Sequence, residues 1–134
     1  MFKKLSLLAV VAVALTSLGA TDAQAADTVA LTKIVNTSDM NIGFDYRFGA
    51  GPWRSIRLAP GESWTLWSNF TYPGSYRHSP IEVRFDSDLR PGFNTWRSFL
   101  PLVRYAPYVD GNLAQTYYFT YSGPGRQFLA MFPA

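Results

Sequence analysis

The chain contains no cysteine, and this absence removes several classes of protein at once. Without a thiolate there is no thiol catalysis, no cysteine-bound metal and no lipid-anchored cysteine. Small domains that work outside the cell are often held by disulfide bonds, and this chain can form none. Its stability must therefore come from a hydrophobic core. Aromatic residues, 16% of the chain, can supply one, because each ring buries a large apolar area.

Histidine and glutamate are also scarce, which limits the catalytic chemistry available. His78 is the only histidine, and no second one exists to complete a transition-metal site. Glu62 and Glu82 are the only glutamates, and both have the sequence surroundings of surface charges rather than of a glycosidase pair. No Gly-x-Ser-x-Gly motif occurs. We therefore predict a protein that is not an enzyme, with no catalytic residues, no bound metal and no cofactor.

Charge of either sign is modest. The formal net charge of the whole chain is +3, and it falls to +2 if residues 1–25 are removed, because Lys3, Lys4 and Asp22 leave with them. So small a positive charge is weak for a nucleic-acid-binding protein. We predict no nucleic-acid partner.

What the chain does have is an N-terminal segment with the layout of a secretory signal peptide. Lys3 and Lys4 precede an uncharged apolar run over Leu5–Leu18, and Ala23-Gln24-Ala25 supplies a small-residue cleavage site. The apolar run is shorter than the roughly 20 residues that cross a bilayer. We expect residues 1–25 to be a signal peptide and residues 26–134 to be one domain, secreted or periplasmic, without a transmembrane anchor.

The rest of the chain is patterned as strands and turns. In Met40–Phe48 apolar and polar residues alternate, as is typical of a half-buried strand. Pro60-Gly61 has the chemistry of a type II turn. Strands are expected at 28–36, 40–48, 53–58, 63–70, 81–86, 115–121 and 126–132. Residues 95–105 contain Pro101 and are expected to form an edge strand, a bulged strand or two short pieces.

No segment after residue 26 has apolar residues at helical spacing. Seven to eight short strands predict an antiparallel β-sandwich or a small barrel. Strand alternation also predicts which side chains form the core, and these are Phe44, Tyr46, Val83, Phe85, Tyr117 and Phe119.

Short polar motifs in the expected turns each have two interpretations. Asp86-Ser87-Asp88 and Asp110-Gly111-Asn112 offer oxygen ligands of the kind that Ca²⁺ uses, but Asp and Asn also cap turns by binding their own backbone. Turn capping is the favoured interpretation. Triplets beginning at Asn36 and Asn69 match the N-glycosylation pattern, and whether either is modified stays open.

The tryptophans and tyrosines carry the main signal for binding. Alternation places Trp67 on the opposite face of its strand from Trp64, Leu66 and Phe70, so Trp67 is expected to face outward. An exposed tryptophan can stack on a sugar or anchor a protein partner. We predict a binding surface centred on Trp67, with Tyr72, Tyr76 and Arg77 from the following loop. The alternative is that the fold itself covers Trp67.

Residues 33–86 resemble a known pattern. Ile34-Val35-Asn36-Thr37 is followed by a strand ending in Phe44-x-Tyr46-x-Phe48 and then by Leu58-Ala59-Pro60-Gly61-Glu62-Ser63. This arrangement is similar to small exported β-domains of unknown function with an N-T/S…L-x-P-G-x-S/T pattern. More distantly it resembles the β-domain of the von Hippel–Lindau protein, a sandwich that binds a modified peptide. The resemblance implies a sandwich and assigns no functional residue.

These observations favour a secreted or periplasmic β-domain that acts by binding or as a structural component. Its partner would be an extracellular or envelope protein or a glycan. Two alternatives stay open: a secreted hydrolase acting on carbohydrate, and an inhibitor of extracellular proteases that uses an extended loop such as 71–80 or 87–94.

Overall fold

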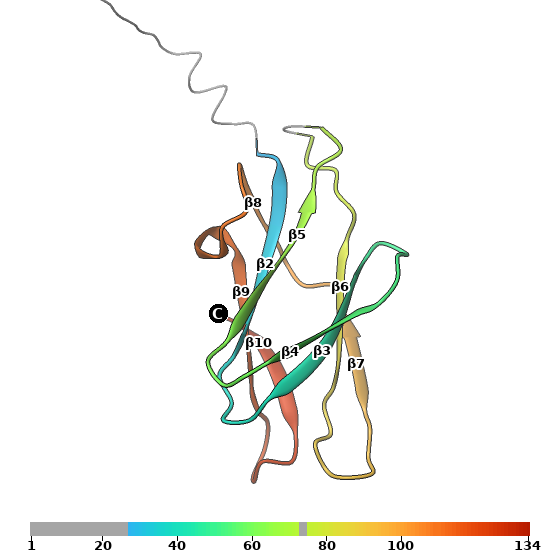
Figure 1. Ribbon diagram of the computed structural model, residues 1–134, viewed down its shortest axis with the longest axis vertical. Helices are drawn as coiled ribbons and strands as arrows, with labels where there is room; N and C mark the ends of the chain where they lie inside the picture. Colours follow the sequence, from blue (N-terminus) through green and yellow to red (C-terminus); the bar gives the residue numbers. More distant parts are fainter. Residues whose placement is uncertain (1–26, 73–74) are drawn as a thin grey trace, which may run out of the picture.

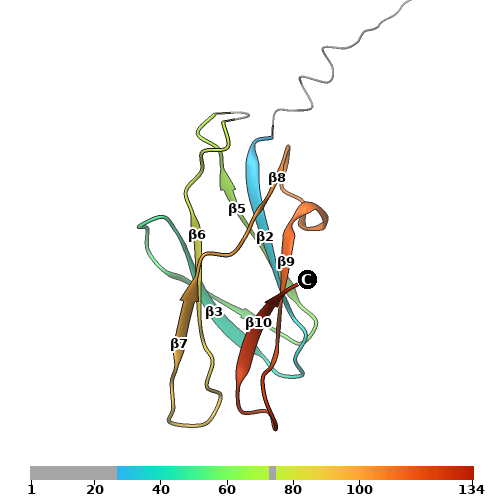
Figure 2. The same cartoon turned by 180° about the vertical axis from the view of Figure 1, so that it is seen from behind.

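The computed structural model describes residues 27–72 and 75–134. They form two β-sheets that pack face to face, as Figures 1 and 2 show. One sheet contains β2 (Val29–Asn36), β5 (Ser63–Asn69), β8 (Arg104–Ala106), β9 (Gln115–Tyr121) and β10 (Leu129–Pro133). The other contains β3 (Ile42–Phe48), β4 (Arg54–Leu58), β6 (Ile81–Asp86) and β7 (Trp96–Phe99). The predicted all-β sandwich is confirmed, and the predicted signal peptide, residues 1–25, lies outside the described residues.

The order of strands determines which edges stay open. The first sheet runs β10-β9-β2-β5, with β8 also beside β2, and the second runs β4-β3-β6-β7. Neighbouring strands in the described part of the chain are antiparallel except β2 and β9, which are parallel. The parallel pair differs from the antiparallel sheets that we expected. It forms because β8 and the short 3₁₀ helix η2 (Gly111–Leu113) carry the chain back to the end of the sheet where β2 begins.

Turn chemistry fixes the connection between β4 and β5 as the sequence predicts. Gly61 has φ +81°, the left-handed conformation that a type II turn requires after proline. The Glu62 N–H donates to the Ala59 carbonyl at 3.0 Å, which closes the turn. The Glu62 carboxylate accepts the Ala59 N–H at 2.7 Å, so this glutamate is a turn residue.

The main core lies between the two sheets and follows the period-two pattern. Phe44, Val83, Phe85, Tyr117 and Phe119 are buried, as predicted, and the rings of Phe85 and Phe119 meet edge to face with centroids 5.1 Å apart. Tyr46 is only half-buried, so its predicted burial was wrong. It packs against the core from a position near the open edge strand β5, beside the ring of Phe48.

A second, smaller core covers the outer face of β2. Val29 and Leu31 point away from the main core yet are buried in a cluster with Leu113 and Ala114 at η2 and with Ala106 of β8, which pairs with Val29. Strand β2 is therefore apolar on both faces, and its sequence VALTKIVN shows little alternation for that reason.

Residues 95–105 divide into two short strands in different sheets, one of the three outcomes expected for them. Pro101 lies between β7 and β8, where the chain crosses from one sheet to the other. The Thr32 hydroxyl donates to the Leu102 carbonyl at 2.6 Å and thereby ties the crossing to β2. The ninth strand, beyond the seven or eight expected, arises from this division. No helix in the described residues is long and apolar enough to cross a membrane.

Candidate functional site

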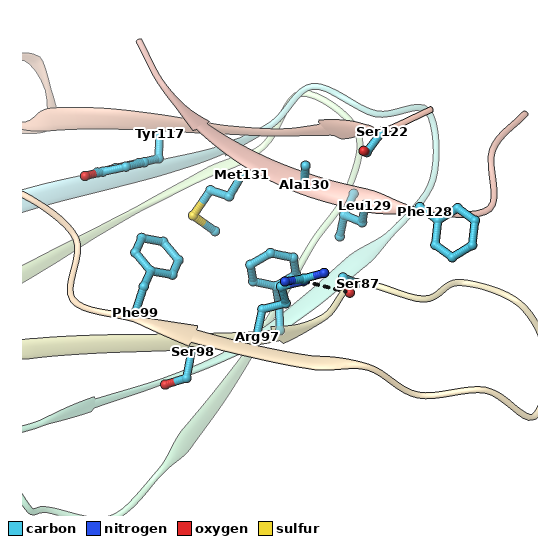
Figure 3. Close-up of a pocket in the computed structure, with 11 residues that line it drawn as sticks. Ser87, Arg97, Ser98, Phe99, Tyr117, Ser122, Phe128, Leu129, Ala130 and Met131 are labelled. Atoms are coloured by element: carbon cyan, nitrogen blue, oxygen red, sulfur yellow. Dashed lines mark hydrogen bonds between the residues drawn. The ribbon is translucent and has the colours of Figure 1, made fainter. Parts of the chain in front are cut away.

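A large hollow, which we call the lateral cleft, opens along one side of the sandwich. It lies between β7, the last strand of one sheet, and β10, the last strand of the other, and its volume is about 540 Å³. Figure 3 shows the side chains around it. This volume falls within the range of roughly 300–1,000 Å³ that is typical of small-molecule sites. Its lining includes Phe85, Arg97, Phe99, Tyr117, Leu129 and Met131, together with three serines.

The cleft exists because neither β7 nor β10 has a further strand on its outer side in the described structure. At one end the two sheets are joined, because the Leu129 N–H donates to the Ser87 carbonyl at 2.9 Å. Toward the other end the Leu102 N–H of the crossing segment donates to the Tyr117 hydroxyl at 2.8 Å. Between these two connections, solvent reaches Phe99 and Met131, which are partly buried and pack against the core.

The floor of the lateral cleft is apolar. Phe85 and Leu129 are buried core residues that face it. The ring of Phe99 packs near that of Tyr117, with centroids 5.8 Å apart. Figure 3 shows the Met131 side chain pointing into the cleft from β10, opposite Phe99 on β7. An apolar group entering here would replace water against these side chains, which is favourable by roughly 25 cal/mol per Å² of apolar surface buried.

One charged residue lines the cleft. Arg97 pairs with Phe85 in the β6–β7 register, so both side chains lie on the inner face of their sheet. The Arg97 Nε lies 3.4 Å from the Ser87 hydroxyl oxygen, a long hydrogen bond that Figure 3 marks. Arg97 forms no salt bridge among residues 27–72 and 75–134. The cleft thus combines an apolar floor with a cation at its mouth.

The outer face of the second sheet is polar, and two ion pairs join β3 to β6 across it. Arg84 binds Asp45 at 2.9 Å, and Arg47 binds Glu82 at 2.8 Å. The Arg84 guanidinium also lies over the ring of Trp53, 4.0 Å from its centroid. Hydrogen bonds from Ser98 and Arg47 hold the pKa of Glu82 below its ordinary value. This face is the solvated side that strand alternation predicts, and Asp45, Glu82 and the two arginines that bind them already have partners.

The predicted outward position of Trp67 is confirmed. Its side chain is 45% exposed on β5, and Trp64 is 41% exposed. Both line a second hollow of about 280 Å³, together with Tyr46, Phe48 and Arg54 from β3 and β4. Two tryptophans from opposite faces reach the same hollow because β5 is an edge strand.

The other three predicted binding residues do not line the hollow beside Trp67. Tyr72, Tyr76 and Arg77 lie in the loop that follows β5. The ring of Tyr76 packs against that of Tyr105, with centroids 4.9 Å apart, and Arg77 offers its carbonyl to the Thr71 N–H at 2.7 Å. The predicted four-residue surface is thus divided between a hollow on one side of β5 and the loop beyond its end.

His78 and Asp110, which were considered for catalysis or metal binding, make contacts that hold the fold together. His78 packs against Phe70 and Tyr105, and its Nδ1 lies 3.0 Å from the Ser79 carbonyl oxygen. Asp110 accepts the Asn112 N–H at 2.9 Å, which caps η2, so the turn-capping interpretation describes what this carboxylate does. In the part of the chain that the structure describes, no three His, Asp or Glu side chains gather where they could hold a metal ion.

Neither a protein-family model nor a curated protein matches the chain. The resemblance of residues 33–86 to small exported β-domains therefore stays a hypothesis.

The lateral cleft was not predicted from the sequence. Phe99 and Arg97 fall in the segment whose structure was left open, and Met131 lies in the last strand, where nothing distinguished it from a core residue. Parity along β7 could have placed Arg97 and Phe99 on one face. The cleft itself depends on β7 and β10 both being edge strands, and no local pattern indicates the order of strands in a sheet.

Proposed function

We propose that this protein is an exported, non-catalytic binding domain that takes an apolar group of its ligand into the lateral cleft. The observation that carries the proposal is the cleft itself: about 540 Å³, floored by Phe85, Phe99, Leu129 and Met131, and open to solvent between two edge strands. A concave, mostly apolar pocket with few polar groups is the usual form of a small-molecule site.

The lowered pKa of two carboxyl groups, Glu82 and Asp88, supports binding over hydrolysis. A glycosidase needs one carboxyl group with a raised pKa to act as general acid. Here Ser98 and Arg47 lower the pKa of Glu82, and Arg90 lowers the pKa of Asp88. Both groups are thereby held in the ionised form, which suits a structural ion pair.

Export rests on the N-terminal sequence. The small residues that end at Ala25 predict a mature chain beginning at Ala26, secreted or periplasmic. N-terminal sequencing of the protein recovered from the exported fraction tests this. Recovery from the cytosol with Met1 still present would contradict export. The proposal that the cleft binds a ligand would not be affected.

Binding is tested with N-phenyl-1-naphthylamine, a neutral dye whose fluorescence rises in apolar surroundings. We expect saturable binding to the purified protein. Met131→Lys places a charge in the cleft and should weaken binding about tenfold or more, because one ammonium group must then be desolvated. Met131→Trp, which fills the cleft with an apolar ring, should have the same effect.

The matched control is Met40→Lys, since Met40 is exposed in the turn between β2 and β3 and does not line the cleft. This variant should bind the dye as the wild type does. Circular dichroism of each variant verifies the fold. Absence of saturable dye binding, or equal binding by all variants, would overturn the proposal.

The hollow beside Trp67 is a second candidate site, favoured by its two half-exposed tryptophans and by Arg54. Indole rings of this kind stack on sugars or anchor protein partners. If a glycan or protein partner is found, Trp67→Ala should weaken its binding by about 2 kcal/mol or more. The same variant should leave dye binding in the lateral cleft unchanged, which separates the two sites.

A further inference from the structure

The charge at the mouth of the lateral cleft narrows the chemistry of its ligand. Arg97 is the only charged residue among those lining the cleft. The nearby Asp88 is already bound by Arg90, whose Nε and Nη2 lie 3.0 and 2.8 Å from its two oxygens. No acidic side chain in the described residues forms a salt bridge with Arg97. Its guanidinium is therefore free to bind an anion.

The β10 wall of the cleft favours a compact ligand over an added β-strand. In a β-strand the N–H and C=O groups of alternate residues point to the same side. The Leu129 N–H is already bound to the Ser87 carbonyl, and Pro133, at the end of β10, has no N–H. Met131 thus provides the only open N–H along this side of β10. A peptide could not build a ladder of useful length along β10, because strand addition depends on repeated main-chain bonds.

We infer that the lateral cleft binds an amphiphilic monocarboxylate, such as a free medium-chain fatty acid. This inference rests on the proposed function. The apolar chain would lie along Phe99, Met131 and Leu129, and the carboxylate would sit at the mouth against Arg97. A guanidinium presents paired N–H donors that match the two oxygens of a carboxylate, and such bonds are stronger than those between neutral groups.

Calorimetric titration of the purified protein with three probes tests the inference. Decanoate carries both the chain and the carboxylate, decanol carries the chain alone, and acetate carries the carboxylate alone. We expect decanoate to bind about tenfold or more tightly than decanol, as a charge-assisted pair allows, and acetate to show no measurable binding. Arg97→Gln should remove the preference for decanoate while leaving decanol binding unchanged.

The control variant is Arg57→Gln, which removes an exposed arginine from β4, a different edge strand. It should retain the preference for decanoate. Equal binding of decanoate and decanol by the wild type would overturn the carboxylate inference while leaving the apolar cleft, and so the proposed function, intact. Loss of the preference in Arg57→Gln as well would also overturn it, because the effect would then follow net charge. If neither decanoate nor decanol binds while the neutral dye does, the inference of an amphiphilic ligand is overturned and the proposed function stands.

Discussion

A single buried amide connects the two sheets at one end of the sandwich. Asn36, at the end of β2, is fully buried, and its Nδ2 donates to the carbonyls of Met40 at 2.8 Å and Leu58 at 3.0 Å. Its Oδ1 accepts the Ser38 N–H at 2.9 Å. Every polar position of the side chain is thus used, and a glycan on the folded protein would displace these bonds.

We expect Asn36→Ala to lower the free energy of unfolding by about 2–4 kcal/mol, because it removes the buried amide donor to the Leu58 carbonyl and the acceptor of the Ser38 N–H. Asn69 is the matched control, since it also begins an acceptor triplet but its side chain is exposed. Asn69→Ala should change stability by less than about 0.5 kcal/mol. Urea denaturation of both variants measures the difference, and equal stabilities would contradict the role given to Asn36.

Phe85 belongs both to the core and to the floor of the lateral cleft. It is buried, and its ring meets that of Phe119 edge to face. Phe85→Ala should lower the free energy of unfolding by about 3–5 kcal/mol, the usual cost of removing a buried aromatic ring. Phe93→Ala, at an exposed loop position, is the control. A loss below about 1 kcal/mol for Phe85→Ala would show that the β6 side chain faces water.

At the scale of elements, the ion pair between Arg47 of β3 and Glu82 of β6, with a hydrogen bond from Ser98 of β7, makes the stability of the fold depend on pH. Glu82 accepts hydrogen bonds from Ser98 and Arg47, which lower its pKa below the ordinary value of 4.5. A carboxyl group whose pKa is lower in the folded state stabilises the fold above its unfolded pKa. That stability is lost as the pH falls below 4.5 and through the folded-state pKa.

Thermal melting between about pH 6 and pH 3 measures this dependence. Glu82→Gln should melt with a shallower dependence on pH than the wild type, because the amide does not titrate. Ser98→Ala, which removes the largest cause of the lowered pKa, should produce a smaller change in the same direction. Identical pH profiles for Glu82→Gln and the wild type would contradict the assignment.

Elements that neighbouring residues specify could be predicted from the sequence, and features that depend on distant residues could not. The strand over Met40–Phe48 and the turn at Pro60-Gly61 are specified by neighbouring residues, and both were predicted. The apolar cover on the outer face of β2 comes from Leu113 and Ala114, which lie far later in the chain at η2, and no local pattern indicates it. The predicted burial of Tyr46 was wrong for a related reason. Its exposure depends on β5 being the edge strand of the facing sheet, which no local pattern indicates.

At the scale of the whole molecule, the two sides of the sandwich differ in which edge strands meet there and in how these strands are connected. The turn at Pro60-Gly61 links β4 to β5, which are edge strands of the two sheets, and the lateral cleft opens between the other two edge strands. This asymmetry results from strand order, which the sequence does not display. A binding surface could be predicted only at Trp67, because exposure of that residue follows from parity alone. No sequence pattern distinguishes the residues of the lateral cleft, since each resembles an ordinary core or surface position.

The central claim, that the lateral cleft is the ligand site, is tested most directly by nuclear magnetic resonance of ¹³C-labelled methionine methyl groups. Met131 lies in the cleft, and Met40 lies in an exposed turn outside it. During titration with N-phenyl-1-naphthylamine we predict that the Met131 methyl signal shifts and saturates with the dye fluorescence, because an aromatic ring then lies beside it. The Met40 signal should stay in place. A Met131 signal that does not move while the dye binds to saturation would contradict the account.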